Sequence, residues 1–359
     1  MNRSSSALLL WLLMSFVQMS CTKLENDEYT LNESPPNYPG NSWEQVRDVT
    51  AAGWSAVLLD EARDYAEDIS SNAVMIIDNG KLIQAWGNTK EKYYVASIRK
   101  SFLGVLYDIP VSNGSVSLDA TLAEYGIDDT SPALSEEEKK ATVRDLLRSS
   151  SGVYHASAAS DADDLPQRGS HSPGSYFYYN NWDFNALGTI FEIRTGLSIY
   201  DAFQKYIAEP TGMEDFVIRD GRYDSINASI HRAYHFDMTA RDMARFGLLC
   251  LREGEWNGKQ LISREWMNES TTTKVAFSAR NGGDDYTGGY GYLWWINTLR
   301  DAGLTEGDYS AQGNYAQAIF VLPAKNLVIV HRGKVSALKE ISGTEVYVLL
   351  KKILAAKNN

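Results

Sequence analysis

Ser97 and Lys100 are the residues of this chain best suited to chemistry. They lie where a strand-like run gives way to a helical one, and residues three apart on a helix share a face. A neutral lysine amine can take the proton of a serine hydroxyl and so make a nucleophile without a histidine. The spacing alone is weak evidence, because Ser20–Lys23 and Ser336–Lys339 repeat it.

Two further segments downstream of Ser97 carry polar side chains at the edge of predicted elements. The first runs from Pro173 into Tyr178-Tyr179-Asn180-Asn181, which contains two overlapping Tyr-x-Asn patterns. The second is a β-type run that ends in His331-Arg332-Gly333-Lys334. Taken singly, the first segment is better explained as a tyrosine-rich turn with half-buried phenols. For the second, a strand-end histidine that merely caps a hydrogen bond is the lesser alternative.

In this order and at this relative spacing, the three segments resemble the active-site motifs of serine hydrolases related to class C β-lactamases and penicillin-binding proteins. Those motifs read S-x-x-K, Y-x-N and K/H/W-x-G. The resemblance covers about residues 51 to 355 and includes Thr142–Leu147 and Met238–Gly247. The run His231–Gly247 is most similar to the branch that contains 6-aminohexanoate-oligomer hydrolases, which are esterase-like enzymes that also cleave amides.

The resemblance implies a role for each motif. Ser97 would attack a carbonyl carbon and become acylated. Lys100 and Tyr179 would share the proton transfers, and which of them is the resting base stays open, since both have ordinary pKa values near 10. The oxyanion hole would consist of the backbone amides of Ser97 and Lys334, with Gly333 allowing the strand to approach the substrate closely.

The choice between the two tyrosines also follows from the resemblance. The family places its tyrosine six residues after the proline of Pro-Gly and nine before a helix glycine. Both offsets, from Pro173 and from Gly188, select Tyr179 and Asn181. Asn181 is then expected to position the acyl side of the substrate, and Tyr178 to point elsewhere.

His331 departs from the β-lactamase pattern, which usually has a lysine there to receive the substrate carboxylate. Histidine is mostly neutral at pH 7. Arg332 and Lys334 should point to the opposite side of the strand, so they cannot simply replace the missing cation. The sequence therefore favours an esterase or amidase for a small acyl compound over an enzyme for β-lactams or peptide C-termini.

Composition limits the alternatives. The chain has 359 residues, of which 44% are hydrophobic and 22% charged, as expected for a globular protein. Its net charge of −12 disfavours nucleic acid as a partner. No histidine spacing resembles a metal-ligand set, and nothing indicates a cofactor. A small ester, amide or short peptide is the expected partner.

The N-terminus predicts export. Residues 1–20 have the layout of a secretory signal peptide, and the run ends at Ser20-Cys21, which resembles a bacterial lipobox. We expect Cys21 to be lipidated, which would make the protein a periplasmic or outer-membrane lipoprotein of a bacterium. Simple secretion with an incidental cysteine is the alternative. Residues 21–50 are predicted to be a tether, and residues 51–359 to form the hydrolase domain.

The elements expected around the motifs indicate an α+β fold. Asn79-Gly80 between two β-type runs predicts a hairpin. Strands at both chain ends, with a mainly helical region at about 105–235 between them, predict one antiparallel sheet flanked by helices, of the β-lactamase/transpeptidase-like type. Beyond the hairpin we expect a helix near 55–69, β-rich runs at Tyr290–Ile296, Tyr315–Leu322 and Leu327–His331, and a last helix at 344–356.

Two other readings remain within reach of the same motifs. One is a D-amino-acid peptidase, a DD-carboxypeptidase or a β-lactamase-like enzyme. The other is a ligand sensor that is acylated at Ser97 but does not turn over. Deacylation separates the sensor from the enzymes, because an acylated sensor would not recover its free serine.

Overall fold

The computed structural model describes residues 37–158, 165–225, 228–277, 288–297, 303–334 and 340–358. The predicted signal peptide, Cys21 and the first part of the predicted tether lie outside the described residues, so export and lipidation stay predictions. Within the described ranges no helix is both long enough and apolar enough to cross a membrane.

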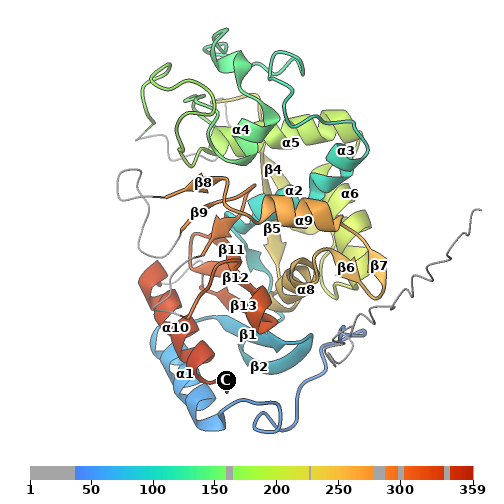
Figure 1. The fold of residues 1–359 in the computed structure, drawn as a ribbon, viewed down its shortest axis with the longest axis vertical. Helices are drawn as coiled ribbons and strands as arrows, with labels where there is room; N and C mark the ends of the chain where they lie inside the picture. Colours follow the sequence, from blue (N-terminus) through green and yellow to red (C-terminus); the bar gives the residue numbers. More distant parts are fainter. Residues whose placement is uncertain are drawn as a thin grey trace, which may run out of the picture. The chain divides into compact units, whose positions relative to one another are not determined.

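The main sheet of the described chain has eight strands in the order β2-β1-β13-β12-β11-β10-β9-β8, and all neighbours are antiparallel (Figure 1). Both ends of the chain contribute to it, as the sequence predicts. Its strands are β1 (Ala73–Asp78), β2 (Lys81–Gly87), β8 (Val275–Ala276), β9 (Gly289–Tyr290), β10 (Trp295–Ile296), β11 (Tyr309–Gly313), β12 (Gln317–Leu322) and β13 (Leu327–Arg332).

Helices cover both faces of this sheet. One face carries α1 (Ala56–Asp68) and α10 (Gly343–Ala355), which pack against each other, and the other carries α8 (Ala240–Leu251). Side chains alternate along β13. Leu327 and Ile329 join the core under α1 and α10, and Val328 and Val330 join the core under α8. A strand buried on both faces reads as an unbroken apolar run, which is why the sequence reveals β13.

The mainly helical region lies between β2 and α8 and includes a small sheet, β3-β5-β4, that leads into the helix bearing Ser97. In Figure 1 it occupies the end of the molecule away from α1 and α10. Its strands and main helices are β3 (Tyr93–Tyr94), α2 (Ile98–Leu106), α3 (Asp108–Ser112), α4 (Val143–Leu147), α5 (Asn181–Thr195), α6 (Ile199–Phe203), β4 (Gly221–Asp224) and β5 (Ala233–Met238). After α8 come the hairpin of β6 (Glu255–Trp256) and β7 (Lys259–Gln260) and the helix α9 (Arg264–Ser270).

Two expectations about strands were wrong. The run Tyr290–Ile296 is two short strands, because the chain turns back where the Gly291 N–H donates to the Trp294 carbonyl at 2.9 Å. The strand β11, at Tyr309–Gly313, was not predicted at all. Its sequence, Tyr-Ser-Ala-Gln-Gly, has too few β-branched residues to stand out as a strand.

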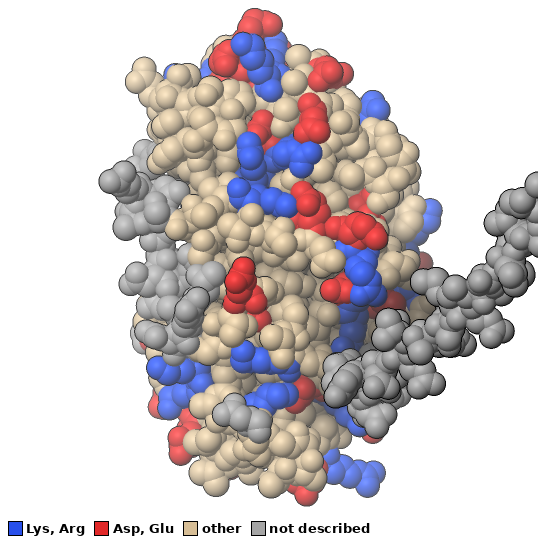
Figure 2. Space-filling view, in the orientation of Figure 1, with Lys and Arg blue, Asp and Glu red and all other residues tan. Residues whose placement is uncertain are grey.

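The predicted tether also extends too far. Tyr38 donates a hydrogen bond to the Glu255 carboxylate at 2.9 Å, and Trp43 donates from its indole to the Arg241 carbonyl at 3.2 Å. These aromatic side chains hold the segment against the body of the protein, and the compact unit begins at Pro36. On the surface, Figure 2 shows acidic and basic side chains interspersed over the visible face.

The packing of α8 on the sheet gives a test of the fold. A Cβ at Gly247 would come within 2.5 Å of Val328 on β13. We expect Gly247→Ala to lower the free energy of unfolding by about 1–3 kcal/mol, because it overpacks a core that has no room to relax. Urea denaturation measures this. Gly343→Ala is the matched control, since nothing lies within 4 Å of a Cβ there; equal stability of the two variants would contradict this packing.

Candidate active site

Ser97 lies at the N-terminal end of α2, directly after a strained turn. Ala96 has a φ of 49°, in the left-handed region, and this residue turns the chain from β3 into the helix. Such a backbone costs roughly 1–3 kcal/mol and is typical of functional sites. The Ser97 hydroxyl makes no capping hydrogen bond to its own helix, so it is available to other partners.

Lys100 lies one turn along α2 and is the nearest partner of the serine. Its Nζ is 2.7 Å from the Ser97 Oγ. The lysine side chain is 2% exposed, and it forms no ion pair with any described carboxylate. Burial, with a further contribution from the neighbouring Arg99 charge, lowers the pKa of Lys100 well below its usual value. The amine is therefore disposed to be neutral and to accept a proton.

Tyr179 reaches the same serine from the helical region. Its hydroxyl is in hydrogen-bonding contact with Ser97, and the Lys100 Nζ lies 4.6 Å from the centre of its ring. Trp295 also stacks on the Tyr179 ring, with 5.2 Å between ring centroids. Burial raises the pKa of Tyr179 to about 12, although Ser97 and the Arg99 charge oppose this. A phenol that burial keeps protonated and an amine whose proton burial disfavours thus meet at one hydroxyl.

The residues next to Tyr179 have different roles, and Asn180 has a purely structural one. Asn180 is the N-cap of α5: its side chain accepts from the Trp182 N–H at 3.1 Å and donates to the Val153 carbonyl at 2.5 Å. Asn181 is the first residue of α5, and its side chain makes no hydrogen bond to another described residue. Tyr178 packs against Tyr154, with ring centroids 5.7 Å apart, away from Ser97.

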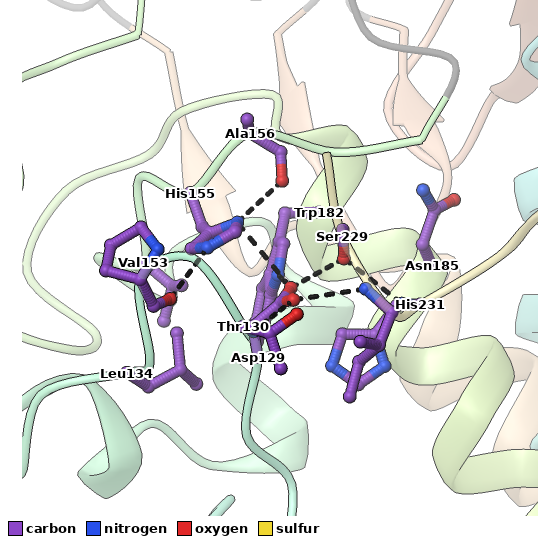
Figure 3. A network of polar contacts seen from close by, with 12 residues as sticks. Asp129, Thr130, Leu134, Val153, His155, Ala156, Trp182, Asn185, Ser229 and His231 are labelled. Atoms are coloured by element: carbon purple, nitrogen blue, oxygen red, sulfur yellow. Dashed lines mark hydrogen bonds and ion pairs between the residues drawn. The ribbon is translucent and has the colours of Figure 1, made fainter. Parts of the chain in front are cut away.

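A buried network fixes the start of α5. The Asp129 carboxylate accepts hydrogen bonds from the Trp182 indole at 2.7 Å and the Ser229 hydroxyl at 2.5 Å, and His155 lies 3.5 Å away (Figure 3). The Ile230 N–H, next to His231, also donates to it at 3.1 Å. Because Trp182 follows Tyr179 by three residues, this network holds the phenol in place.

The predicted third motif is not at the site. His331 lies on the face of β13 that packs toward α1 and α10; its ring contacts the Ser71 hydroxyl at 2.8 Å and the Ala316 carbonyl at 2.7 Å. Burial lowers its pKa to about 4. Arg332 does point to the opposite side of the strand, where its Nε donates to Gln317 at 2.6 Å.

Gly333 and Lys334 are equally misplaced as site residues. A Cβ at Gly333 would meet the Tyr315 carbonyl at 2.2 Å, not Ser97. Lys334 is exposed, and it does not line the cavity at the serine. The expectations that His331 and Gly333 border the nucleophile, and that Lys334 completes the oxyanion hole, were therefore wrong in their placement.

The glycine that approaches the nucleophile is Gly313, at the end of β11. A Cβ there would come within 2.7 Å of both the Ser97 nitrogen and the Val95 carbonyl oxygen. Ala311, on the same face two residues earlier, is in the core under α8. The third motif is thus Ala311-Gln312-Gly313. This segment carries no reactive side chain that would mark it in the sequence.

A cavity of about 220 Å³ opens at the nucleophile. No described residue accepts a hydrogen bond from the backbone N–H of Ser97 or of Asn314, the residue after Gly313. Two free amides at a nucleophile form the arrangement that stabilises an oxyanion. The cavity is lined by Ser97, Tyr179, Trp295, Gln312, Gly313 and Asn314.

Comparison with known proteins identifies the family. Residues 58–331 match the Beta-lactamase family. The chain belongs to the beta-lactamase family. It therefore has the fold of a family of hydrolases, as the sequence motifs predict. Among the described residues, no group of three or more His, Cys, Asp or Glu side chains is arranged to hold a metal ion.

Individual relatives are distant. An uncharacterized protein from Alkalihalophilus pseudofirmus is 24% identical over 309 residues, covering 77% of this chain and 87% of its own length. A Bacillus anthracis protein assigned as a 6-aminohexanoate-dimer hydrolase has 22% identity and a TM-score of 0.63, with 81% of this chain and 80% of that chain covered. EstCE1, described as a hydrolase with promiscuous acyltransferase activity, has 14% identity and a TM-score of 0.61, with 85% and 100% covered. At these identities the structural likeness shows the fold.

The position of Gly313 gives a second test. In Gly313→Ala the new methyl group would press on the Ser97 nitrogen, so we expect kcat/KM to fall by at least about a hundredfold, as when an oxyanion donor is lost. Hydrolysis of a chromogenic ester and a thermal melt together separate activity from stability. Gly40→Ala, where nothing lies within 4 Å of a Cβ, should behave like wild type. Full activity in Gly313→Ala would show that β11 does not border the reaction.

Proposed function

We propose that this protein is a serine hydrolase that cleaves a small ester or amide through an acyl-enzyme on Ser97. One observation carries the proposal: a buried lysine amine lies 2.7 Å from the Ser97 Oγ, without an acid partner among the described residues. Because no acid competes for the amine, its available role is to exchange a proton with that hydroxyl.

The geometry supports a definite sequence of proton transfers. The Lys100 amine takes the Ser97 proton as the serine oxygen attacks the substrate carbonyl. The amides of Ser97 and Asn314 receive the negative charge that develops on the carbonyl oxygen. The Tyr179 hydroxyl, which also contacts Ser97, then gives a proton to the leaving alcohol or amine. Water then hydrolyses the acyl-enzyme by the reverse transfers.

The cavity lining favours a substrate without a carboxylate. In the family's β-lactamases a lysine occupies the first position of the third motif, and here that position is Ala311. None of the described residues that line the cavity is a cation. The aromatic rings of Tyr179 and Trp295 instead offer an apolar surface. A neutral acyl group fits this lining better than a β-lactam or a peptide C-terminus does.

A substrate panel tests the proposal. A chromogenic short-chain ester, a chromogenic cephalosporin and a D-alanyl dipeptide are compared with wild type and Ser97→Ala. We expect ester turnover, little cephalosporin cleavage, and loss of activity in the mutant. Intact-mass spectrometry should detect an acyl adduct on wild type that then disappears.

Each other result is informative. Full ester turnover in Ser97→Ala would show that Ser97 is not the nucleophile. Rapid cephalosporin cleavage means that a cation outside the described lining receives the carboxylate. A Ser97 adduct that never hydrolyses identifies a sensor.

The pH profile tests the assignment of the base. Because Lys100 must be neutral to accept a proton, activity is present above its pKa and is lost as the pH falls through it. We expect the rising limb of kcat/KM to lie well below pH 10, and no loss from Tyr179 ionisation until the pH approaches about 12. Lys100→Met should lower kcat/KM by about 10²–10⁴-fold. A limb that rises only near pH 10 would mean that Lys100 has an ordinary pKa and is charged at neutral pH, which would contradict its assignment as the base.

A further inference from the structure

Arg99, between Ser97 and Lys100 in sequence, is a second buried basic side chain beside the site. It is 2% exposed, and its guanidinium carbon lies 4.4 Å from the centre of the Tyr234 ring. Its Nη1 is buried without a hydrogen-bond partner among the described residues. No described carboxylate forms an ion pair with it. Buried Arg245 on α8, which does not line the cavity, instead donates to the Thr211 and Gly40 carbonyls and lies 3.6 Å from Glu214.

The surroundings do not neutralise this charge. The two acids on the small sheet have other partners: Asp224 lies 3.0 Å from His235, and Asp237 forms an ion pair with Arg222 at 3.0 Å. Burial and the Arg99 charge lower the pKa of His235 to about 4, so the imidazole is neutral near pH 7. Besides Lys100, the titratable groups within the field of Arg99 are Tyr94 on β3, Tyr179 before α5, Tyr200 on α6, and Tyr234 and His235 on β5. Arg222 and Asp224 on β4 act in turn on Tyr94 and His235.

A buried arginine in these surroundings is costly. Guanidinium stays charged in proteins, and an apolar side chain of similar volume would fill the same space without the loss of hydration. Neutral tyrosines and a neutral imidazole stabilise the charge only weakly. The charge acts on the amine of the next residue as it does on His235, since two like charges in a dry site repel each other.

We propose that Arg99 is a positioning residue for the reaction: its permanent charge keeps the adjacent Lys100 amine in its neutral, proton-accepting form. The inference rests on the proposed function, because it needs Lys100 to act as the base. Arg99 is not among the described residues that line the cavity, so it acts through Lys100. Its charge also favours the negative charge that develops near Ser97 during attack.

The test is the pH dependence of kcat/KM in two neutral variants, Arg99→Met and Arg99→Gln, with the ester that wild type turns over. Without the charge, protonated Lys100 is less disfavoured, so the rising limb moves to higher pH. We expect kcat/KM to fall about tenfold on the acid side of the wild-type midpoint and to recover toward the wild-type value at high pH. The two variants differ in polarity and packing, so a shift common to both reports the lost charge.

Arg245→Met is the matched control, because it removes a buried arginine that has hydrogen-bond partners outside the site. It should lower the melting temperature and leave the midpoint of the rising limb in place. Folded Arg99 variants that keep the wild-type midpoint would overturn the inference. So would a kcat/KM that falls by the same factor at every pH, because a purely structural role predicts that result. Either result leaves the acyl-enzyme intact, whereas an active Ser97→Ala protein would overturn the proposed function itself.

Discussion

The arrangement of the site depends on one contact, between the Lys100 amine and the Ser97 hydroxyl. An amine held in the core without a carboxylate cannot keep a proton cheaply, so desolvation makes it a base. The cost of that burial is met by the fold, because α2 is buried along its whole length between the main sheet and the helical region. The nucleophile is thus activated by the same packing that gives the protein its stability.

Tyr179 supplies the opposite proton state at the same oxygen. Burial lowers the pKa of an amine and raises that of a phenol, so one dry site prepares an acceptor and a donor at once. The phenol arrives from a segment 82 positions along the chain from Ser97. Its placement relies on the Asn180 cap and on the Trp182 indole bound to Asp129.

The sequence predicts a site residue when its partners are close in sequence or when its spacing matches a family motif. Ser97 and Lys100 are found because a single helical turn brings them together, and Tyr179 because its spacing from Pro173 and Gly188 fits the family. The central strands β1, β12 and β13 are found because they are apolar on both faces. In contrast, β11 is short and polar, and so its role is invisible in the residues themselves.

The error over His331 has a geometric cause. β11 and β13 flank β12 and run in the same direction, so Ala311-x-Gly313 and His331-x-Gly333 end at the same edge of the sheet. They are two strand spacings apart, about 9.5 Å. Only the β13 end is evident in the sequence, because it follows an apolar run and carries a histidine, whereas β11 has neither feature. Only the contact between Gly313 and the Ser97 backbone decides between them.

Everything proposed for this site requires a neutral lysine beside a protonated phenol before substrate arrives. Neutron diffraction from deuterium-exchanged crystals near neutral pD would count the deuterons on both groups directly. The account predicts two deuterons on the Lys100 nitrogen and one on the Tyr179 oxygen. Three deuterons on the lysine, facing a bare phenolate, would contradict it.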